Sequence, residues 1–329
     1  MAGRIAARID TFDGVRAFAF GSVFAYHAIH LPYGQLGVDL FFVLSGFLIT
    51  RNLIELRSAT RRSALGVFFY RRLLRIVPPY YLALVVMLAT CTFPLHDTPW
   101  YFGFASNIRD TLYPVLEGPM VTMWSIAVEE QFYLLWPLVV LLVPRRYLGR
   151  AFGLAMLGAV VFRLAVHSNG DAVYRLMFSR MDLLAAGGLL ALFDARLFDW
   201  RRGFAWALSI AFSIFVVSTR VHGLASETVR YAVTAVGMAS LLALVRTCER
   251  GPLYALLTNP MISYVGRISY VCYLVHDIAI ERVHALGLPG PAAVVLAFGL
   301  TIAFASVSWF ALEQPLGRLR GRVRVVPAC

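Results

Sequence analysis

Long apolar runs, separated by short polar segments, occupy most of this chain. A helix that crosses a bilayer needs about 20 predominantly apolar residues, and runs near that length recur from end to end. The pattern predicts an all-α, polytopic membrane protein with about ten transmembrane helices. The sixth run is short and contains the pair Gly187 and Gly188, so we expect a broken, tilted or re-entrant helix there. The predicted spans are residues 14–31, 37–56, 79–96, 124–143, 151–167, 181–194, 203–220, 229–246, 268–286 and 291–313.

The placement of basic residues tests this count. All 30 basic residues are Arg, and short cytoplasmic loops collect positive charge whereas the opposite loops do not. With ten helices and a cytoplasmic N-terminus, all but seven of them fall on the inner side. An odd number of spans would scramble this bias, so both termini are predicted to be cytoplasmic. The seven outer residues are Arg109, Arg163, Arg175, Arg180, Arg220, Arg230 and Arg282.

Composition supports a bilayer location and excludes an ordinary soluble domain. Hydrophobic residues make up 60% of the 329 positions and charged residues 15%, with a mean hydropathy of +0.72. The net charge of +12 is interpreted as topology and contact with anionic lipid headgroups, with no nucleic-acid partner. Residues 1–329 are interpreted as one membrane domain with no appended soluble domain, and the first apolar run as a retained anchor. The cysteines lack metal or disulfide spacing, and no metal is expected: Cys91, Cys248, Cys272 and Cys329.

Ionisable residues inside the predicted spans are the first candidates for function, because charge in hydrocarbon is costly. Arg16 and His27 lie eleven residues apart in DGVRAFAFGSVFAYHAIHL, which separates them by roughly 16 Å along a helix. One side chain could meet a charged group near one membrane face while the other works deeper. Alternatively, Arg16 extends to the headgroups and His27 is a hydrogen-bonded interior histidine.

A second polar position, Asp39, lies near the start of the next span in GVDLFFVLSGFLITRNL. A short loop between antiparallel helices would bring Asp39 and His27 to the same end, where the carboxylate could orient the imidazole and stabilise its charged form. In the alternative interpretation, Asp39 caps a helix whose face with Val43 and Gly46 is a packing seam.

The stretch FFYRRLLRIVPPYYLAL is basic and amphipathic and runs into a span. Arg72 and Arg75, three residues apart, would project together from the cytoplasmic side and suit phosphate oxygens. The positive-inside bias and lipid phosphates could also account for this pair. Pro78 and Pro79 are predicted to mark the start of the helix.

Two later segments add polar groups. In MWSIAVEEQFYLLWPL, which begins beside Trp124, the residues Ser125, Glu129 and Tyr133 share one helix face. The alternative role for Glu129 is a structural ion pair with an Arg of another helix. In GRISYVCYLVH, His276 could face a cavity or be a satisfied interior histidine. The neighbouring Tyr270 and Tyr273 could be ordinary interfacial aromatics.

Taken in order, these segments resemble the acyltransferase-3 family of integral-membrane O-acyltransferases. The resemblance runs through nearly the whole chain, and the order of the segments makes it specific. The segments are DGVR with His27 eleven residues beyond its Arg, GVDLFFVLSGFLI, RRLLRIVPPYY, WSIAVEEQFYLLWP, RMDLLAAGGLLA, GRISYVCYLVH and WFALEQP.

The resemblance implies transfer of an acyl group, usually acetyl, from a coenzyme A thioester to a hydroxyl of a carbohydrate, glycolipid or small molecule in a bacterial inner membrane. It also marks His27 with Arg16, and Arg72 with Arg75, as functional. An alcohol needs a base as it attacks a thioester, and histidine suits that task, so His27 is the expected general base. An acetylated His27 is the mechanistic alternative.

The remaining expectations divide the candidates by role. A transporter of an acyl donor or lipid-linked sugar is the alternative function, because buried charges around a midplane cavity would look similar. Donor and acceptor are expected from opposite membrane faces. The predicted catalytic residues are His27, Asp39 and Glu129, the donor-binding residues are Arg16, Arg72 and Arg75, and the substrate-binding residues are Trp124, Ser125, Tyr133 and His276.

Overall fold

The computed structural model describes residues 9–57, 60–90, 95–114, 118–221 and 223–320. Every regular element in those ranges is helical, which confirms the all-α prediction. Besides short 3₁₀ turns and a π-helical turn at Trp309–Glu313, the helices are α1 (Thr11–Ile29), α2 (Leu36–Leu56), α3 (Arg61–Thr90), α4 (Thr98–Phe102), α5 (Ser106–Leu112), α6 (Met123–Leu142), α7 (Leu148–Ala165), α8 (Gly170–Arg175), α9 (Met181–Leu192), α10 (Arg201–Ser218), α11 (Leu224–Arg246), α12 (Pro252–Leu257), α13 (Pro260–His284), α14 (Gly290–Ser308) and α15 (Gln314–Arg320).

Each of the ten predicted spans overlaps one of these helices. Seven helices in the described ranges are long and apolar enough to cross a membrane: those containing α2, α3, α6, α7, α10, α11 and α14. The other three are α9, which has only 12 residues, and α1 and α13, which carry several polar and charged residues. The count of ten spans and the side on which the termini lie stay predictions.

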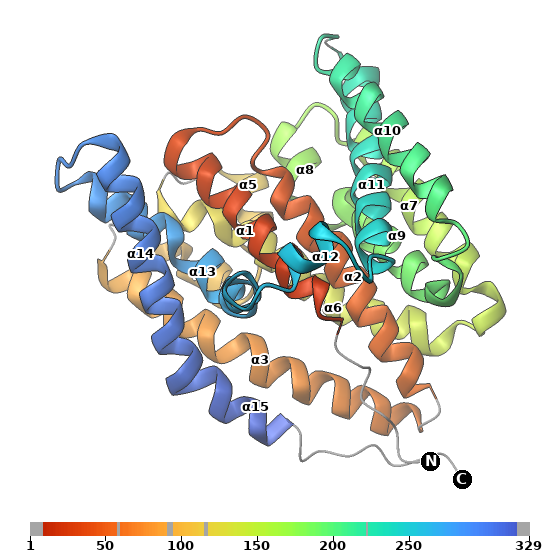
Figure 1. Ribbon diagram of the computed structural model, residues 1–329, viewed down its shortest axis with the longest axis horizontal. Coiled ribbons are helices and arrows are strands. Elements are labelled where there is room, and N and C mark those ends of the chain that lie inside the picture. Colours follow the sequence, from red (N-terminus) through yellow and green to blue (C-terminus); the bar gives the residue numbers. More distant parts are fainter. Residues whose placement is uncertain (1–8, 58–59, 91–94, 115–117, 222, 321–329) are drawn as a thin grey trace.

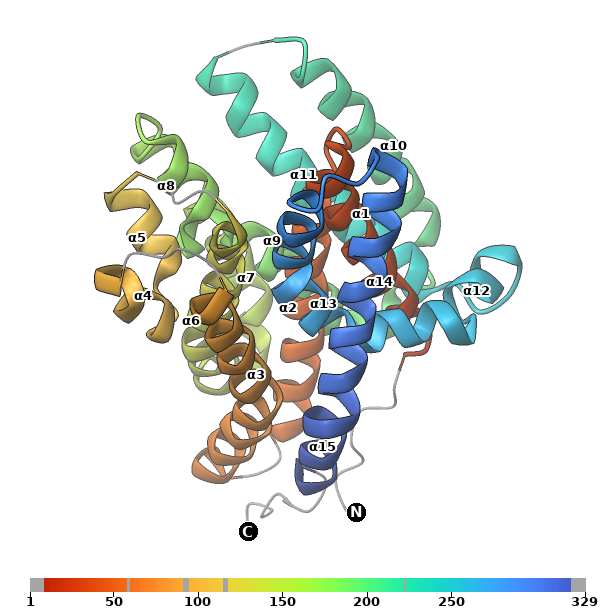
Figure 2. The same ribbon diagram turned by 90° about the vertical axis from the view of Figure 1, so that its left-hand side faces the viewer.

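The helices form one bundle around α1 and α2, which run through its middle (Figure 1). Helices α13 and α14 lie on one side of this pair, and α7, α9, α10 and α11 lie on the other. The short helices α4, α5 and α8 gather beside α6 (Figure 2). Segments far apart in the chain are therefore brought together near α1 and α2.

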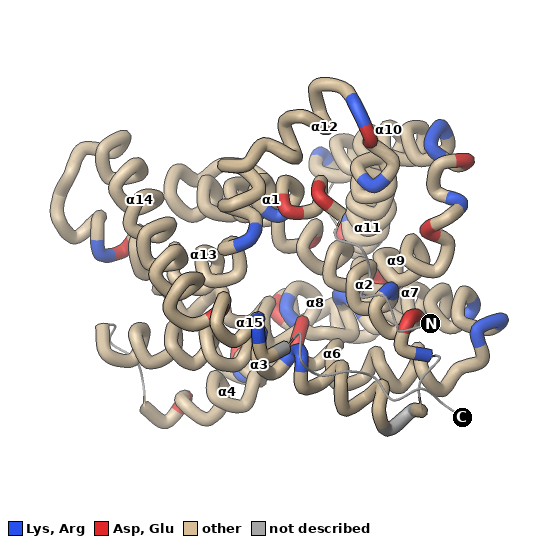
Figure 3. The backbone as a smooth tube through the Cα atoms, turned by 60° about the horizontal axis from the view of Figure 1, so that its bottom comes forward, with Lys and Arg blue, Asp and Glu red and all other residues tan. Residues whose placement is uncertain are grey.

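The outer helices present apolar side chains to the surroundings. Trp206 on α10 is 72% exposed, Val295 on α14 is 73% exposed and Leu154 on α7 is 67% exposed. Helix α14 carries no charged residue along its whole length (Figure 3). Exposed apolar surface of this kind suits contact with lipid, because in water so many large exposed hydrophobic side chains would favour aggregation.

Helix α3 differs from the expected arrangement. Pro78 and Pro79 were expected at the start of a helix, but they lie inside one continuous helix that joins the basic amphipathic stretch to the span. The two residues that follow are anchored from outside the helix. Tyr80 donates a hydrogen bond to the carbonyl of Tyr101 and Tyr81 donates one to that of Phe102, both at 2.8 Å. These bonds hold the helix against the α4 region just beyond the prolines.

The glycine pair in α9 allows close packing and does not break the helix. A Cβ atom added at Gly187 would collide with the backbone of α2 at Val43, and one at Gly188 would press on Trp136. The α9 backbone therefore lies directly against α2. The structure confirms the predicted packing seam on α2, and helix α9 packs against it.

Helices α1 and α13 lie side by side and run in the same direction. Near their first turns, a Cβ at Gly266 would collide with the carbonyl of Asp13. Near their last turns, His27 contacts Asp277. Because the contacts advance along both helices together, residues near the start of each helix face one region and residues near the end face another.

We expect Gly187→Ala to destabilise the protein, since the added methyl group must push the α9 and α2 backbones apart. Overpacking of this kind costs about 1–3 kcal/mol, which should lower the midpoint of thermal unfolding in detergent. Gly158→Ala is the matched control, because Gly158 is an α7 glycine with no atom close to the site of the new Cβ. Equal unfolding midpoints for both variants would contradict the packing argument.

Candidate active site

Three of the predicted arginines converge on one cavity. Arg16 from α1 and Arg72 and Arg75 from α3 line it, and Arg267 from the start of α13 joins them. Its empty volume, with the open space at its mouth included, is about 810 Å³. We call it the arginine cavity. The first three arginines are predicted from the sequence, and the packing of α1, α3 and α13 brings them together with Arg267.

The arginine cavity carries more positive than negative charge. Glu129 from α6 is its acidic lining residue, and this carboxylate accepts hydrogen bonds from the hydroxyls of Ser45 and Tyr133. The guanidinium of Arg72 lies over the Tyr133 ring, 4.7 Å from its centre. Arg16 contacts Asp13 behind the cavity at 3.2 Å. Planar guanidinium groups gathered in this way suit phosphate oxygens, which accept their paired hydrogen bonds.

A second cavity lies at the other end of α1 and contains His27. We call it the histidine cavity; its volume is about 860 Å³, again with its mouth included. Its lining combines flat aromatic rings with hydrogen-bonding groups. The residues include Tyr26, His27, His30, Gln35, Trp124, Tyr174 and Arg175.

His27 has a carboxylate partner on α13. Its Nδ1 lies 3.2 Å from Oδ1 of Asp277. Asp277 is only 9% exposed. When Nδ1 donates its proton to this carboxylate, Nε2 keeps the lone pair that a general base needs. The same carboxylate stabilises the imidazolium that forms when the base takes up a proton.

The predicted partner of His27 was wrong. Asp39 pairs with Arg180 at 3.2 Å, and both residues are buried. Arg180 also lies over the Tyr174 ring, 4.4 Å from its centre. The start of α2 faces the 3₁₀ turn before α9, so the Asp39 carboxylate meets Arg180 there, and α13 supplies the carboxylate for His27.

Two other predicted residues do not line the histidine cavity. Glu129 lines the arginine cavity together with Ser125 and Tyr133, so its carboxylate is on the Arg side of the site. His276 is fully buried and is not among the lining residues of either cavity. Its Nδ1 contacts the Tyr273 carbonyl one helical turn back at 2.7 Å, and its ring is centred 5.2 Å from that of His27. His276 therefore packs behind the base and does not reach the space for a substrate.

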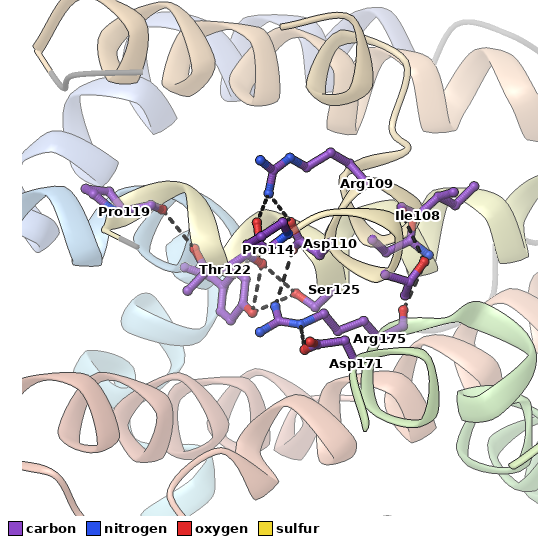
Figure 4. A network of polar contacts seen from close by, with 12 residues as sticks. Ile108, Arg109, Asp110, Pro114, Pro119, Thr122, Ser125, Asp171 and Arg175 are labelled. Atoms are coloured by element: carbon purple, nitrogen blue, oxygen red, sulfur yellow. Dashed lines mark hydrogen bonds and ion pairs between the residues drawn. The ribbon is translucent and has the colours of Figure 1, made fainter. Parts of the chain in front are cut away.

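The wall of the histidine cavity is supported by a chain of ion pairs outside the candidate spans (Figure 4). Arg175 lies 3.0 Å from Asp171 and 3.4 Å from Asp110. Arg109 contacts Asp110 at 3.5 Å and Asp97 at 2.8 Å. Burial raises the pKa of the Asp110 carboxyl, and the charges of Arg175 and Arg109 partly offset this rise.

His27, His276 and Asp277 could also hold a metal ion. Each offers one ligand atom, and these atoms lie within 4.8 Å of one another. Two imidazoles and a carboxylate are a common set for zinc and related cations. A cation on Nδ1 of His27 would replace the hydrogen bond from this nitrogen to Asp277. The metal site and the hydrogen-bonded pair therefore cannot exist at the same time.

Four residues of this site were not assigned a role from sequence: Arg175, Arg267, Tyr273 and Asp277. Asp277 had a usable signal, since it is an acid directly after His276 in an otherwise apolar segment. Arg267 also lies at the start of a quoted segment. Of the four, Asp277 alone is a charge inside a predicted span, and its partner His27 lies on another helix and could not be found from spacing.

Comparison with known proteins gives the family. Residues 9–310 match the model of the acyltransferase-3 family, which is described as an acyltransferase domain. This match covers most of the chain, and the chain belongs to that family. No solved structure matches it.

Its relatives include proteins of Staphylococcus aureus. "Putative O-acetyltransferase SACOL0978" of strain COL is 28% identical over 366 residues, which cover 93% of this chain and 57% of that protein. O-acetyltransferase OatA of strain NCTC 8325 is 29% identical over 349 residues, which cover 92% of this chain and 56% of that protein. The chain thus spans a little over half the length of these curated relatives.

We expect Asp39→Ala and Arg180→Ala each to destabilise the protein, because either change leaves the other charge buried without its partner. Loss of one member of a buried pair costs about 3–5 kcal/mol. The double variant Asp39→Leu with Arg180→Met should recover much of this loss, since it removes both charges. Thermal unfolding of the purified variants measures the three effects. Additive losses in the double variant would contradict the structural role of the pair.

Proposed function

We propose that this chain is a membrane O-acyltransferase that moves an acyl group, in the simplest case acetyl, from acyl-CoA to a hydroxyl of a carbohydrate or related acceptor. The observation that carries the proposal is that two cavities with different linings adjoin one another. One gathers arginines suited to phosphates, and the other contains a histidine held by a carboxylate. The family match and the names of the relatives support the same reaction.

The donor fits the arginine cavity. Arg16, Arg72 and Arg75 bind the phosphates of CoA through charge-assisted hydrogen bonds, and Glu129, held by Ser45 and Tyr133, offsets part of their charge. The helical distance from Arg16 to His27 is roughly 16 Å. An extended pantetheine arm is the part of CoA that covers this distance and delivers the thioester to the base.

The chemistry at His27 follows from its contact with Asp277. Nε2 of His27 takes the proton of the acceptor hydroxyl while the hydroxyl oxygen attacks the thioester carbon. The tetrahedral intermediate collapses, the carbon–sulfur bond breaks, and the CoA thiolate takes up the proton from the imidazolium. Asp277 stabilises that imidazolium, as the carboxylate of a catalytic triad does. The same Nε2 lone pair is also available to attack the thioester, so an acylated His27 stays the mechanistic alternative.

The lining of the histidine cavity supports a sugar-like acceptor. Tyr26, Trp124 and Tyr174 offer flat apolar faces to a ring, and Gln35 and Arg175 offer hydrogen bonds. Since this cavity and the arginine cavity lie at opposite ends of α1, we propose that donor and acceptor enter from opposite faces of the membrane. The acyl group then crosses the bilayer while CoA stays on its own side.

We expect purified protein in sealed proteoliposomes to transfer acetyl from acetyl-CoA on one side to a glycan acceptor on the other. His27→Ala should slow the transfer by about 10²-fold or more, because a general base contributes that much, while the affinity for acetyl-CoA is kept. Product is measured by mass spectrometry and CoA release by a thiol assay. His167→Ala is the control, since His167 is exposed after α7, where its Nδ1 contacts the carbonyl of Leu164.

Three results would count against the proposal. Near-normal turnover in His27→Ala would remove His27 from the mechanism. Transfer only when donor and acceptor share one side would contradict the opposite-face arrangement. Movement of acetyl-CoA or of the acceptor across the membrane without any covalent transfer would identify a transporter.

We expect Arg16→Gln, Arg72→Gln and Arg75→Gln each to raise the KM for acyl-CoA and to leave most of kcat, because each variant loses contacts with donor phosphates. Loss of one charge-assisted hydrogen bond costs about 1.5–3 kcal/mol, or roughly ten- to a hundredfold in affinity. Arg202→Gln is the matched control, since Arg202 is exposed at the start of α10. An unchanged KM in all three variants would show that the cluster serves only topology.

A further inference from the structure

The arginine cavity and the histidine cavity meet at one place. Val38 and Tyr273 are the two residues that line both. The boundary also passes through the start of α6, where Trp124 lines the histidine cavity and its neighbour Ser125 lines the arginine cavity. A group that moves from the arginines to His27 must therefore pass between α6 and α13 at Tyr273.

The side chain of Tyr273, on α13, makes hydrogen-bonding contacts with α6 and the turn before it at this boundary. Its hydroxyl lies 2.6 Å from Oγ of Ser125 and 3.3 Å from the carbonyl oxygen of Thr122. Ser125 itself donates to the Thr122 carbonyl at 3.1 Å, so the phenol can donate its own proton to Ser125 and every hydroxyl proton is used. Figure 4 shows Thr122 and Ser125 side by side on this wall. Tyr273 is 6% exposed and Ser125 is 4% exposed, so the contact is sheltered from water.

The position of this contact creates a requirement for the reaction. If the donor phosphates bind at Arg72 and the base is His27, the thioester must pass the boundary that Tyr273 lines before it meets the acceptor. Water that reached the thioester would compete with the acceptor hydroxyl: it would add its hydroxyl to the acyl carbon and its proton to the CoA sulfur. A closed active site limits such a side reaction.

We propose that Tyr273 is the specificity-determining partition of this enzyme: it separates the donor side from the acceptor side, swings away from Ser125 to admit the acyl group, and keeps water from the thioester. This role rests on the proposed acyl transfer. It makes Tyr273 responsible for the choice between an acceptor hydroxyl and water, and leaves proton removal to His27.

Two variants separate the hydrogen bond from the ring. Tyr273→Phe keeps the bulk and loses the bond to Ser125, so the ratio of acetyl-CoA hydrolysis to acetyl transfer should rise about two- to tenfold, the range for one hydrogen bond. Tyr273→Ala also removes the ring and should raise the ratio further. Tyr264→Phe is the matched control, since Tyr264 lies on the same helix, bonds Ser306 at 2.8 Å and is outside both sets of lining residues. Unchanged ratios in both Tyr273 variants would overturn the proposal.

A second measurement does not depend on activity. Leu48 lines only the arginine cavity, so Leu48→Cys, in a background with all native cysteines replaced by alanine, reports access to that cavity. In sealed proteoliposomes a membrane-impermeant charged thiol reagent should label this cysteine from one side only. With Tyr273→Ala added, it should label the cysteine from both sides. Any other pattern counts against the partition. If the labelling changes as expected but the parent protein transfers no acetyl group, the partition stands and the proposed function fails.

Discussion

The cost of placing charge in an apolar bundle is the constraint on which the rest of this structure depends. An ion moved into such an interior costs several kcal/mol unless a partner of opposite charge meets it. Arg163 meets Asp182 at 2.8 Å and Arg180 meets Asp39 at 3.2 Å. Both pairs join α9, or the turn before it, to other helices. These closed pairs account for buried charge that serves the fold.

The arginine cavity is different, because its positive charge is not matched in the same way. Arg16, Arg72, Arg75 and Arg267 line it, whereas Glu129 is its acidic lining residue. Four arginines against one lining carboxylate leave the cavity with an excess of positive charge, which an anionic ligand would offset. Burial alone therefore does not separate structural charges from candidate functional charges in this chain. What separates them is whether a partner of opposite charge matches each one.

Close helix approach makes the two-cavity arrangement possible. Gly266 lets α13 lie against α1 at Asp13, and Gly187 lets α9 lie against α2. With α1 and α13 parallel and nearly in contact, Arg16 and Arg267 come together at one end, and His27 and Asp277 come together at the other. A long donor and a small reacting centre can then be held by the same pair of helices, with Tyr273 between them.

The sequence by itself determined the helical class, the approximate spans and the local clusters. Arg72 and Arg75 share a face because they lie three residues apart, and Ser125, Glu129 and Tyr133 share one because their spacing follows the helical turn. Local periodicity needs no knowledge of neighbours. The partners of these residues were decided only by the tertiary structure. Asp39 and Arg180 are separated by 141 positions, and His27 finds Asp277 on a helix near the other end of the chain. The continuous path of α3 through Pro78 and Pro79, and the use of Gly187 for packing, were likewise missed. Contacts between distant helices depend on which faces pack together, and that is set by shape and charge summed over the whole bundle, which no spacing within one segment records.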